Sequence, residues 1–213
     1  DRMKRVINLD NWNRKEHFKF FSALDDPFWG ITTTVDFTSI YQQSKNMEVS
    51  FFLYSVHFLL KCINATTAFK LRIENGEVVE YDKINISPTI GREDGTFGFG
   101  FFEYDTDLSL FIENAEKEIH RVKNSTGLSF SKDTARADVI RYSALPWFAF
   151  SEMKHAGSIQ TGDSIPKIST GKLIQEKKRL LLPISISVHH GLVDGRNVAE
   201  FIQNVKDGQN NTL

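Results

Sequence analysis

The sequence predicts an α/β protein, an α+β two-layer sandwich in which helices cover a mixed β-sheet mainly on one side. Three observations support this fold class: strand-like segments alternate with segments of helical spacing, at least one tight hairpin joins two strands, and no linker divides the 213 residues. We therefore expect one domain that spans residues 1–213.

The composition predicts a folded, soluble protein and excludes several functional classes. Hydrophobic residues make up 40% of the chain, and 18 Phe dominate its aromatic residues, so a sizeable core can form. The formal net charge of -1 gives no basic excess for binding nucleic acid. Because no run of about 18 apolar residues occurs, we also expect no membrane partner. The single cysteine, Cys62, lies in an apolar run, and we expect a buried thiol in a cytoplasmic protein.

The first third of the chain predicts three helices and one strand. A helix runs through Trp12 and Phe21, with Asp10 as its N-cap. A stretch rich in Thr and β-branched residues predicts a strand, which is followed by a short helix and by a long apolar helix capped by Ser50. These three elements are expected at residues 31–37, 39–44 and 51–63.

The middle of the chain begins with a hairpin signal. Asn75 and Gly76 separate two strand-like segments, and both positions of a type I′ turn require positive φ. In residues 96–102, phenylalanines alternate with glycines, which predicts a strand whose glycine face lets another element approach closely. Apolar residues in 108–122 follow helical spacing and predict an amphipathic helix of about four turns.

The last third of the chain predicts strands followed by a final helix. Two strands flank the break at Pro146, and a polar stretch follows them. A later strand contains Pro183, and helical spacing marks the end of the chain. In order, these segments are residues 137–142, 147–150, 151–163, 180–188 and 198–205.

Two adjacent histidines end the strand at residues 180–188. Since neighbouring strand residues face opposite sides, only one of His189 and His190 can point into a given cavity, so the pair makes a poor bidentate metal site. Asp194 follows and can cap the last helix or hold a cation such as Arg14. We expect no metal, and we expect the four isolated histidines to be structural or exposed: His17, His57, His120 and His155.

Four motifs in the same order along the chain carry a resemblance to a known family. Residues 11–18 read NWNRKEHF, 143–147 read SALPW, 179–183 read RLLLP and 189–195 read HHGLVDG. The sequence resembles the chloramphenicol acetyltransferase family of CoA-dependent acyltransferases over nearly its whole length. HHxxxDG by itself is shared with dihydrolipoyl acyltransferases and with peptide-synthesis condensation domains. The resemblance implies the CoA-dependent acyltransferase fold.

The resemblance also implies an enzyme, an antibiotic-resistance acyltransferase. Acetyl-CoA would be the co-substrate, and a hydroxyl of chloramphenicol or a related acceptor would attack it directly in a ternary complex. An imidazole suits removal of the hydroxyl proton, and by its position in the motif His190 would be the general base. Ser143 would be the oxyanion donor, and Asp194 with Arg14 would form a structural ion pair.

The same resemblance places the binding residues and the assembly. Phe20, Phe21 and Phe97 are expected to line the acceptor site, where Phe21 replaces the Tyr of chloramphenicol-modifying members. Ser169 stands where a Thr makes a water-linked contact, and Leu173 stands where an aromatic residue packs on the CoA adenine. We expect a homotrimer whose active sites lie at subunit interfaces.

Two alternatives to this function remain open. One is the catalytic core of a dihydrolipoyl acyltransferase, which shares the fold and the motif; activity with dihydrolipoamide but not with alcohols would support it. The other is a non-catalytic family member that binds a small ligand, for which binding without turnover would be the sign.

Overall fold

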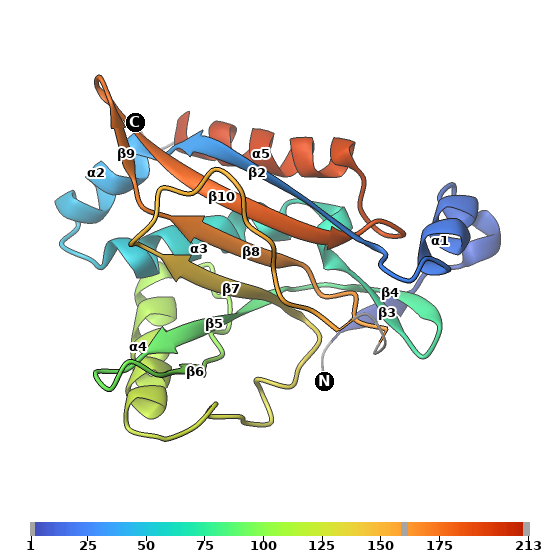
Figure 1. The fold of residues 1–213 in the computed structure, drawn as a ribbon, viewed down its shortest axis with the longest axis horizontal. Coiled ribbons are helices and arrows are strands. Elements are labelled where there is room, and N and C mark those ends of the chain that lie inside the picture. Colours follow the sequence, from blue (N-terminus) through green and yellow to red (C-terminus); the bar gives the residue numbers. More distant parts are fainter. Residues whose placement is uncertain (1–2, 159–161, 211–213) are drawn as a thin grey trace.

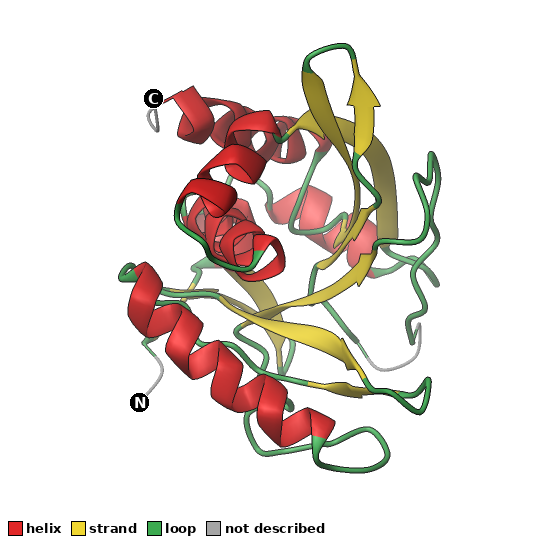
Figure 2. Ribbon diagram, turned by 90° about the vertical axis from the view of Figure 1, so that its left-hand side faces the viewer, coloured by secondary structure: helices red, strands yellow, loops and turns green. Residues whose placement is uncertain are grey.

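A seven-stranded mixed sheet and the helices that cover one of its faces make up most of the computed structural model, which describes residues 3–158 and 162–210 (Figures 1 and 2). The strands lie in the order β2-β10-β8-β7-β5-β6, and β9 pairs with β10. Strands β5, β7 and β8 run parallel, while the other pairs are antiparallel. The strands of this sheet are β2 (Phe28–Asp36), β5 (Asn85–Gly91), β6 (Phe97–Phe99), β7 (Val139–Leu145), β8 (Lys167–Gly171), β9 (Ile174–Glu176) and β10 (Arg179–His189).

The helices and a smaller sheet complete the fold. A three-stranded sheet in the order β1-β4-β3 lies beside the large one. The predicted two-layer α+β class with a mixed sheet is confirmed, although the sequence patterns gave no strand at β1, β5 or β8. The remaining elements are β1 (Lys4–Val6), α1 (Lys15–Ser22), α2 (Thr38–Asn46), α3 (Phe51–Asn64), β3 (Leu71–Glu74), β4 (Glu77–Tyr81), α4 (Leu108–Lys123) and α5 (Gly195–Asn210), with 3₁₀ turns at Leu9–Asn11 and Thr67–Lys70.

Helix α3 lies at the centre of the helical layer and contacts α2, α4 and α5. As predicted, the Ser50 hydroxyl caps it by accepting a hydrogen bond from the Leu53 N–H. The core between α3 and the sheet is continuous, and its fully buried side chains include Val56, Ile184 and Phe201. No helix among the described residues is both long enough and apolar enough to cross a membrane.

The predicted hairpin is confirmed, but the predicted N-cap of the first helix is wrong. Asn75 and Gly76 both have positive φ, 51° and 79°, between β3 and β4. Helix α1 begins only at Lys15, because a 3₁₀ turn capped by the side chain of Asn8 occupies the preceding residues. Asp10 lies within that turn and forms an exposed ion pair with Lys15.

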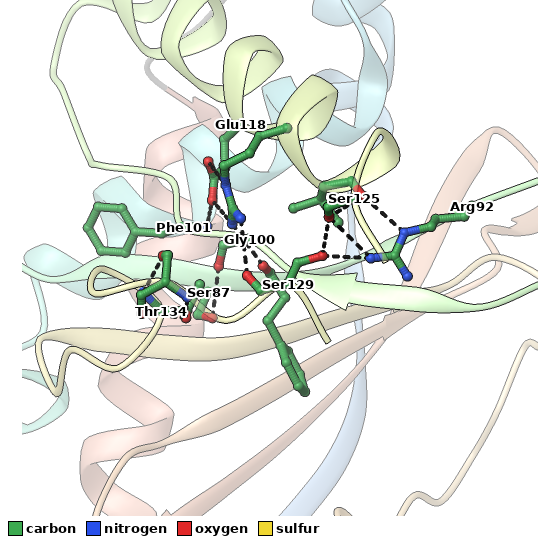
Figure 3. Close-up of polar contacts among 12 residues, drawn as sticks. Ser87, Arg92, Gly100, Phe101, Glu118, Ser125, Ser129 and Thr134 are labelled. Atoms are coloured by element: carbon green, nitrogen blue, oxygen red, sulfur yellow. Dashed lines mark hydrogen bonds and ion pairs between the residues drawn. The ribbon is translucent and has the colours of Figure 1, made fainter. Parts of the chain in front are cut away.

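The glycine face of the predicted Phe-Gly strand packs against α4 and the segment that follows it, as expected for a face without side chains (Figure 3). A Cβ on Gly98 would lie 2.6 Å from Ser129 Oγ and 2.8 Å from Val122 Cγ1, so only glycine fits there. The strand is shorter than predicted and ends at Phe99. Beyond it, Gly100 and Phe102 still bond to the backbone of β5, while the Phe101 N–H, which faces away from β5, donates to Glu118 of α4.

The second predicted strand around Pro146 is wrong, since residues 147–150 form a loop after β7. Trp147 and Phe148 are 72% and 61% exposed there, and Phe148 accepts a bond from Lys172 just beyond β8. The polar stretch predicted at 151–163 continues this loop across the open face of the sheet, in front of β8 and β10 in Figure 1. Its residues 159–161 lie outside the described residues.

Pro183 is tolerated inside β10 because of how the neighbouring strands are arranged. On one side β10 pairs with β2 from Leu181 to His189. On the other side, pairing with β9 ends at Leu181 and pairing with β8 begins at Ile184. The proline therefore stands between two partners, where a missing N–H costs least.

Candidate active site

His189 and His190 leave the end of β10 in opposite directions, as the alternation predicts. His189 is 4% exposed, and its Nδ1 accepts a 3.0 Å hydrogen bond from the Gly191 N–H. Burial lowers the pKa of His189 to about 4, with a smaller contribution from the charge of His190. His189 is therefore neutral at pH 7, and it holds the turn that leads into α5.

The His190 ring is held between aromatic side chains. It stacks on Phe21 at 3.8 Å between centroids and 2° between planes, and Trp29 lies 5.5 Å away on a tilt. Its Nδ1 is buried and lies 3.4 Å from Asp194 Oδ1, without a hydrogen bond to any described residue. Since 32% of the side chain is exposed while Nδ1 is buried, the open edge of the ring carries Nε2.

Arg14 joins the first helix region to this turn. Its guanidinium forms an ion pair with Asp194 and donates to the backbone oxygens of His190 and Gly191, at 2.9 and 3.3 Å. The predicted pairing of Asp194 with Arg14 is confirmed. The Asp194 N–H donates to the side-chain oxygen of Asn197, which fixes the first turn of α5.

A row of hydroxyl side chains crosses the sheet at one register. Ser143 on β7 faces Ser169 on β8, which in turn pairs with Ser185 on β10, and Ser185 pairs with Thr32 on β2. The Ser143 and Ser169 hydroxyl oxygens lie 2.6 Å apart, and Thr32 donates to Ser185 over 3.2 Å. Ser169 is fully buried, while Ser143 is half-buried.

The hydroxyl of Ser143 does not meet the imidazole of His190 within one chain. The serine row crosses β10 at Ser185, five residues before His190, which corresponds to about 17 Å along the strand. Ser143 itself lies two strands to the side, which adds about 10 Å across the sheet. The two groups expected to act on one carbonyl therefore stand at separate places on the surface of one chain.

The structure places the expected binding residues in three different regions. Phe20 and Phe21 lie on α1, where Phe20 is 64% exposed. Phe97 lies on β6, at the opposite edge of the sheet from β2, and is therefore far from Phe20 and Phe21 within one chain. Leu173 packs against the core between β8 and β9. Ser169 lies beside Ser143 on the neighbouring strand and contacts both Ser143 and the ring of His155.

Sequence reasoning gave no role to two residues that border these groups. Trp29 flanks His190 and donates its ring N–H to the Val193 oxygen at 3.0 Å. His155, in the loop over the open face, places Nε2 3.0 Å from the Ser169 hydroxyl oxygen. An isolated histidine in a polar stretch gives no sign of such a partner, because the contact depends on where the loop crosses the sheet.

A pocket of about 830 Å³ opens on the face of the sheet that carries no helices. It lies between the ends of β2 and β10 and the loop, and its lining includes His155, Lys167 and His189. Neither His190 nor Ser143 lines it. Among the described residues, no group of three or more His, Cys, Asp or Glu side chains is arranged to hold a metal ion.

The chain is similar in sequence to chloramphenicol acetyltransferases of known function. The chain is 28% identical over 208 residues to chloramphenicol acetyltransferase 3 of Escherichia coli, with 97% of each chain covered. It is 27% identical over 205 residues to a chloramphenicol acetyltransferase of Clostridioides difficile, with 94% of this chain and 93% of the relative covered.

Solved structures show the same fold. A chloramphenicol acetyltransferase structure superposes with a TM-score of 0.88 at 30% identity, covering 97% of this chain and 99% of the other. A probable dihydrolipoamide acetyltransferase from Listeria monocytogenes superposes at 0.68 with 14% identity, covering 100% of this chain and 95% of the other, and shares the fold alone. The sequence model of chloramphenicol acetyltransferases matches residues 3–206. The chain therefore belongs to the chloramphenicol acetyltransferase family, whose members are CoA-dependent O-acetyltransferases with acetyl-CoA as co-substrate.

Proposed function

We propose that the protein transfers the acetyl group of acetyl-CoA to a hydroxyl of chloramphenicol or of a related aromatic alcohol, with His190 as the general base. The observation that carries this proposal is the setting of the His190 ring. It is clamped against Phe21, its buried Nδ1 faces Asp194, and its open edge presents Nε2. A neutral imidazole with Nδ1–H toward a carboxylate leaves Nε2 free to accept a proton.

The reaction then needs no covalent acyl-enzyme. Nε2 of His190 accepts the hydroxyl proton while the acceptor oxygen attacks the thioester carbonyl carbon. A tetrahedral intermediate forms, and the Ser143 hydroxyl donates a hydrogen bond to its oxyanion. The intermediate collapses by breaking the C–S bond, and the CoA thiolate takes the proton back from the imidazolium. Arg14 and Asp194 hold the histidine turn in place and move no proton.

The separation of His190 from Ser143 supports a homotrimer with active sites between subunits. One chain supplies the imidazole and an adjacent copy supplies the serine, since about 17 Å of strand keeps the two apart within a chain. Ring closure by a heterologous contact gives every subunit both roles. Residues 1–213 form one domain in this proposal, which the continuous core between Phe18 and Val205 supports.

The acceptor pocket is the part of the proposal with the most departures from chloramphenicol-modifying members. Phe21, in place of a Tyr, offers no hydroxyl beside the His190 ring, so recognition there depends on shape and apolar contact. Leu173, in place of an aromatic residue, would pack on the CoA adenine without stacking. An acceptor screen at fixed acetyl-CoA, including chloramphenicol and dihydrolipoamide, identifies the substrate class.

Thiol release from acetyl-CoA, measured with and without chloramphenicol, tests the chemistry. We expect acceptor-dependent release by the wild type and a loss of about 10²- to 10⁴-fold in kcat for His190→Ala. His17→Ala, which truncates an exposed histidine of α1, is the matched control and should leave kcat unchanged. Equal rates for the His190 variant and the control would defeat the proposal.

A mixing experiment tests the shared site. His190→Ala and Ser143→Ala chains, unfolded together and refolded, should recover activity that neither variant has alone, because an interface between the two variants contains one intact His190 and one intact Ser143. Light scattering should give three times the chain mass at micromolar concentration. A monomer that is active, or a mixture with no recovered activity, contradicts the interface site.

A further inference from the structure

A second imidazole, that of His155, is linked to the proposed oxyanion donor Ser143 through the hydroxyl of Ser169. The loop that crosses the open sheet face brings His155 Nε2 to 3.0 Å from Ser169 Oγ, and Ser169 Oγ lies 2.6 Å from Ser143 Oγ. The mechanism above uses neither His155 nor Ser169. Together they form a chain of hydrogen bonds, His155–Ser169–Ser143, that ends at the hydroxyl expected to meet the oxyanion.

The direction of the hydrogen bonds between His155, Ser169 and Ser143 decides whether Ser143 can donate to the oxyanion. Each serine carries one hydroxyl proton, so Ser143 can donate either to Ser169 or to an oxyanion, but not fully to both. If Ser169 donates to Ser143, the Ser143 proton is free. If Ser169 donates to His155, Ser143 is left to donate to Ser169, and its proton points away from the oxyanion. The nitrogen of His155 therefore sets the direction of both serine hydroxyls.

The surroundings of the three groups leave few other ways to set this direction. Ser169 is fully buried between β7 and β10, so bulk water cannot reorient it. Burial and then the nearby charge of Lys167 lower the pKa of His155, so its ring is neutral at pH 7 and has a choice of tautomer. Lys167 itself is engaged with Asp163 at 3.0 Å.

We infer that His155 is a positioning residue which donates its Nε2–H to Ser169, so that Ser169 donates to Ser143 and the Ser143 proton is left for the oxyanion. This inference rests on the proposed role of Ser143. His155 touches no reacting atom in it and acts only through Ser169. The arrangement orients the oxyanion donor before the substrate arrives, and such preorganisation is the source of oxyanion stabilisation.

Three substitutions of His155 separate donor from acceptor at this position. His155→Gln keeps both a side-chain N–H donor and an acceptor, as a neutral histidine does; His155→Glu has nearly the same shape as Gln and, when ionised, only accepts; and His155→Leu does neither. We expect kcat of the Gln variant close to wild type, a loss of a few fold for Leu, and a loss of about 10²-fold for Glu, comparable to removing one oxyanion donor. The KM for acetyl-CoA and the melting temperature should change little between Gln and Glu.

The same substitutions in a Ser169→Ala background test whether the effect passes through Ser169. Without that hydroxyl Ser143 has no competing acceptor, so the difference between Leu and Gln should vanish and most of the loss for Glu should be restored. The direct effect of the Glu charge on the oxyanion is the same in both backgrounds. It therefore cancels when the Gln-to-Glu ratio of kcat is compared between them. An equal Gln-to-Glu ratio of kcat in the two backgrounds would overturn the inference.

A spectroscopic measurement reads the hydrogen-bond direction without any turnover. Nitrogen-15 NMR of the imidazoles, with the His155 signals identified by their loss in His155→Gln, should show the Nε2–H tautomer at pH 7.5. The Nδ1–H tautomer, with Nε2 as an acceptor, refutes the inference. If the wild type shows no acceptor-dependent thiol release, the proposed function fails, whereas this measurement still decides the direction of the hydrogen bonds.

Discussion

Replacing Arg14 by alanine should destabilise the protein far more than replacing the neighbouring Lys15, because the Arg14 side chain is only 16% exposed and bonds to the histidine turn. The guanidinium bonds to Asp194 and to the backbone oxygens of His190 and Gly191. Asp194 is 37% exposed, so we count the ion pair at about 1 kcal/mol, because solvent screens it. Each backbone oxygen that loses its donor costs about 1 kcal/mol more.

The expected loss is therefore about 3 kcal/mol, which lowers the melting temperature of a chain of this size by about 6–12 °C. Calorimetry at one protein concentration measures it, since melting of an oligomer depends on concentration. The control is Lys15→Ala, the neighbouring residue, whose ion pair with Asp10 is exposed and should matter little. Equal melting temperatures for the two variants would refute the reasoning that Arg14 holds the turn.

Three further predictions follow from other parts of the structure. Gly98→Ala should destabilise the protein by about 1–3 kcal/mol in denaturant unfolding, since its Cβ would overlap Val122 and Ser129, whereas Gly91→Ala in the same hairpin meets nothing within 4 Å and should be neutral. Burial lowers the pKa of His189 in the folded protein to about 4, so its contribution to stability is present above about pH 6.5 and is lost as the pH falls toward 4. The melting temperature should therefore fall between about pH 6.5 and pH 4, and this dependence on pH should be weaker in His189→Asn. Cys62 is 3% exposed and burial raises the pKa of its thiol to about 12, so the native protein should not react with a thiol reagent, and one thiol should appear on denaturation. A native chain that reacts at once would contradict the burial of Cys62 and would confound the thiol-release assay.

Local patterns predicted the parts of the fold that depend on a few neighbouring residues. The turn at Asn75 and Gly76 needs only positive φ, and the Ser50 cap needs only one backbone N–H. The patterns failed where another element decides the outcome. Residues 147–150 are apolar enough for a strand but have no neighbour to pair with, and β8, with its polar Lys167 and Ser169, is a strand because β7 and β10 pair with it on both sides.

The candidate site divides in the same way. The HHxxxDG motif predicted a histidine strand end, and the pairing of Arg14 with Asp194 followed from the family resemblance. The structure supplied the physical difference between the two histidines, since the Nδ1 of His189 is occupied by the Gly191 N–H while His190 keeps an open edge.

The sequence by itself determined the fold class, the family and the chemical groups, because these depend on residue types at short spacings. Only the tertiary structure decided which groups meet. It separated His190 from Ser143, because the row of serines crosses β10 at Ser185, five residues before His190. It also brought His155 to Ser169 through a loop that crosses the sheet. Such contacts depend on strand order and register, which relate residues far apart in the chain and leave no mark on local composition.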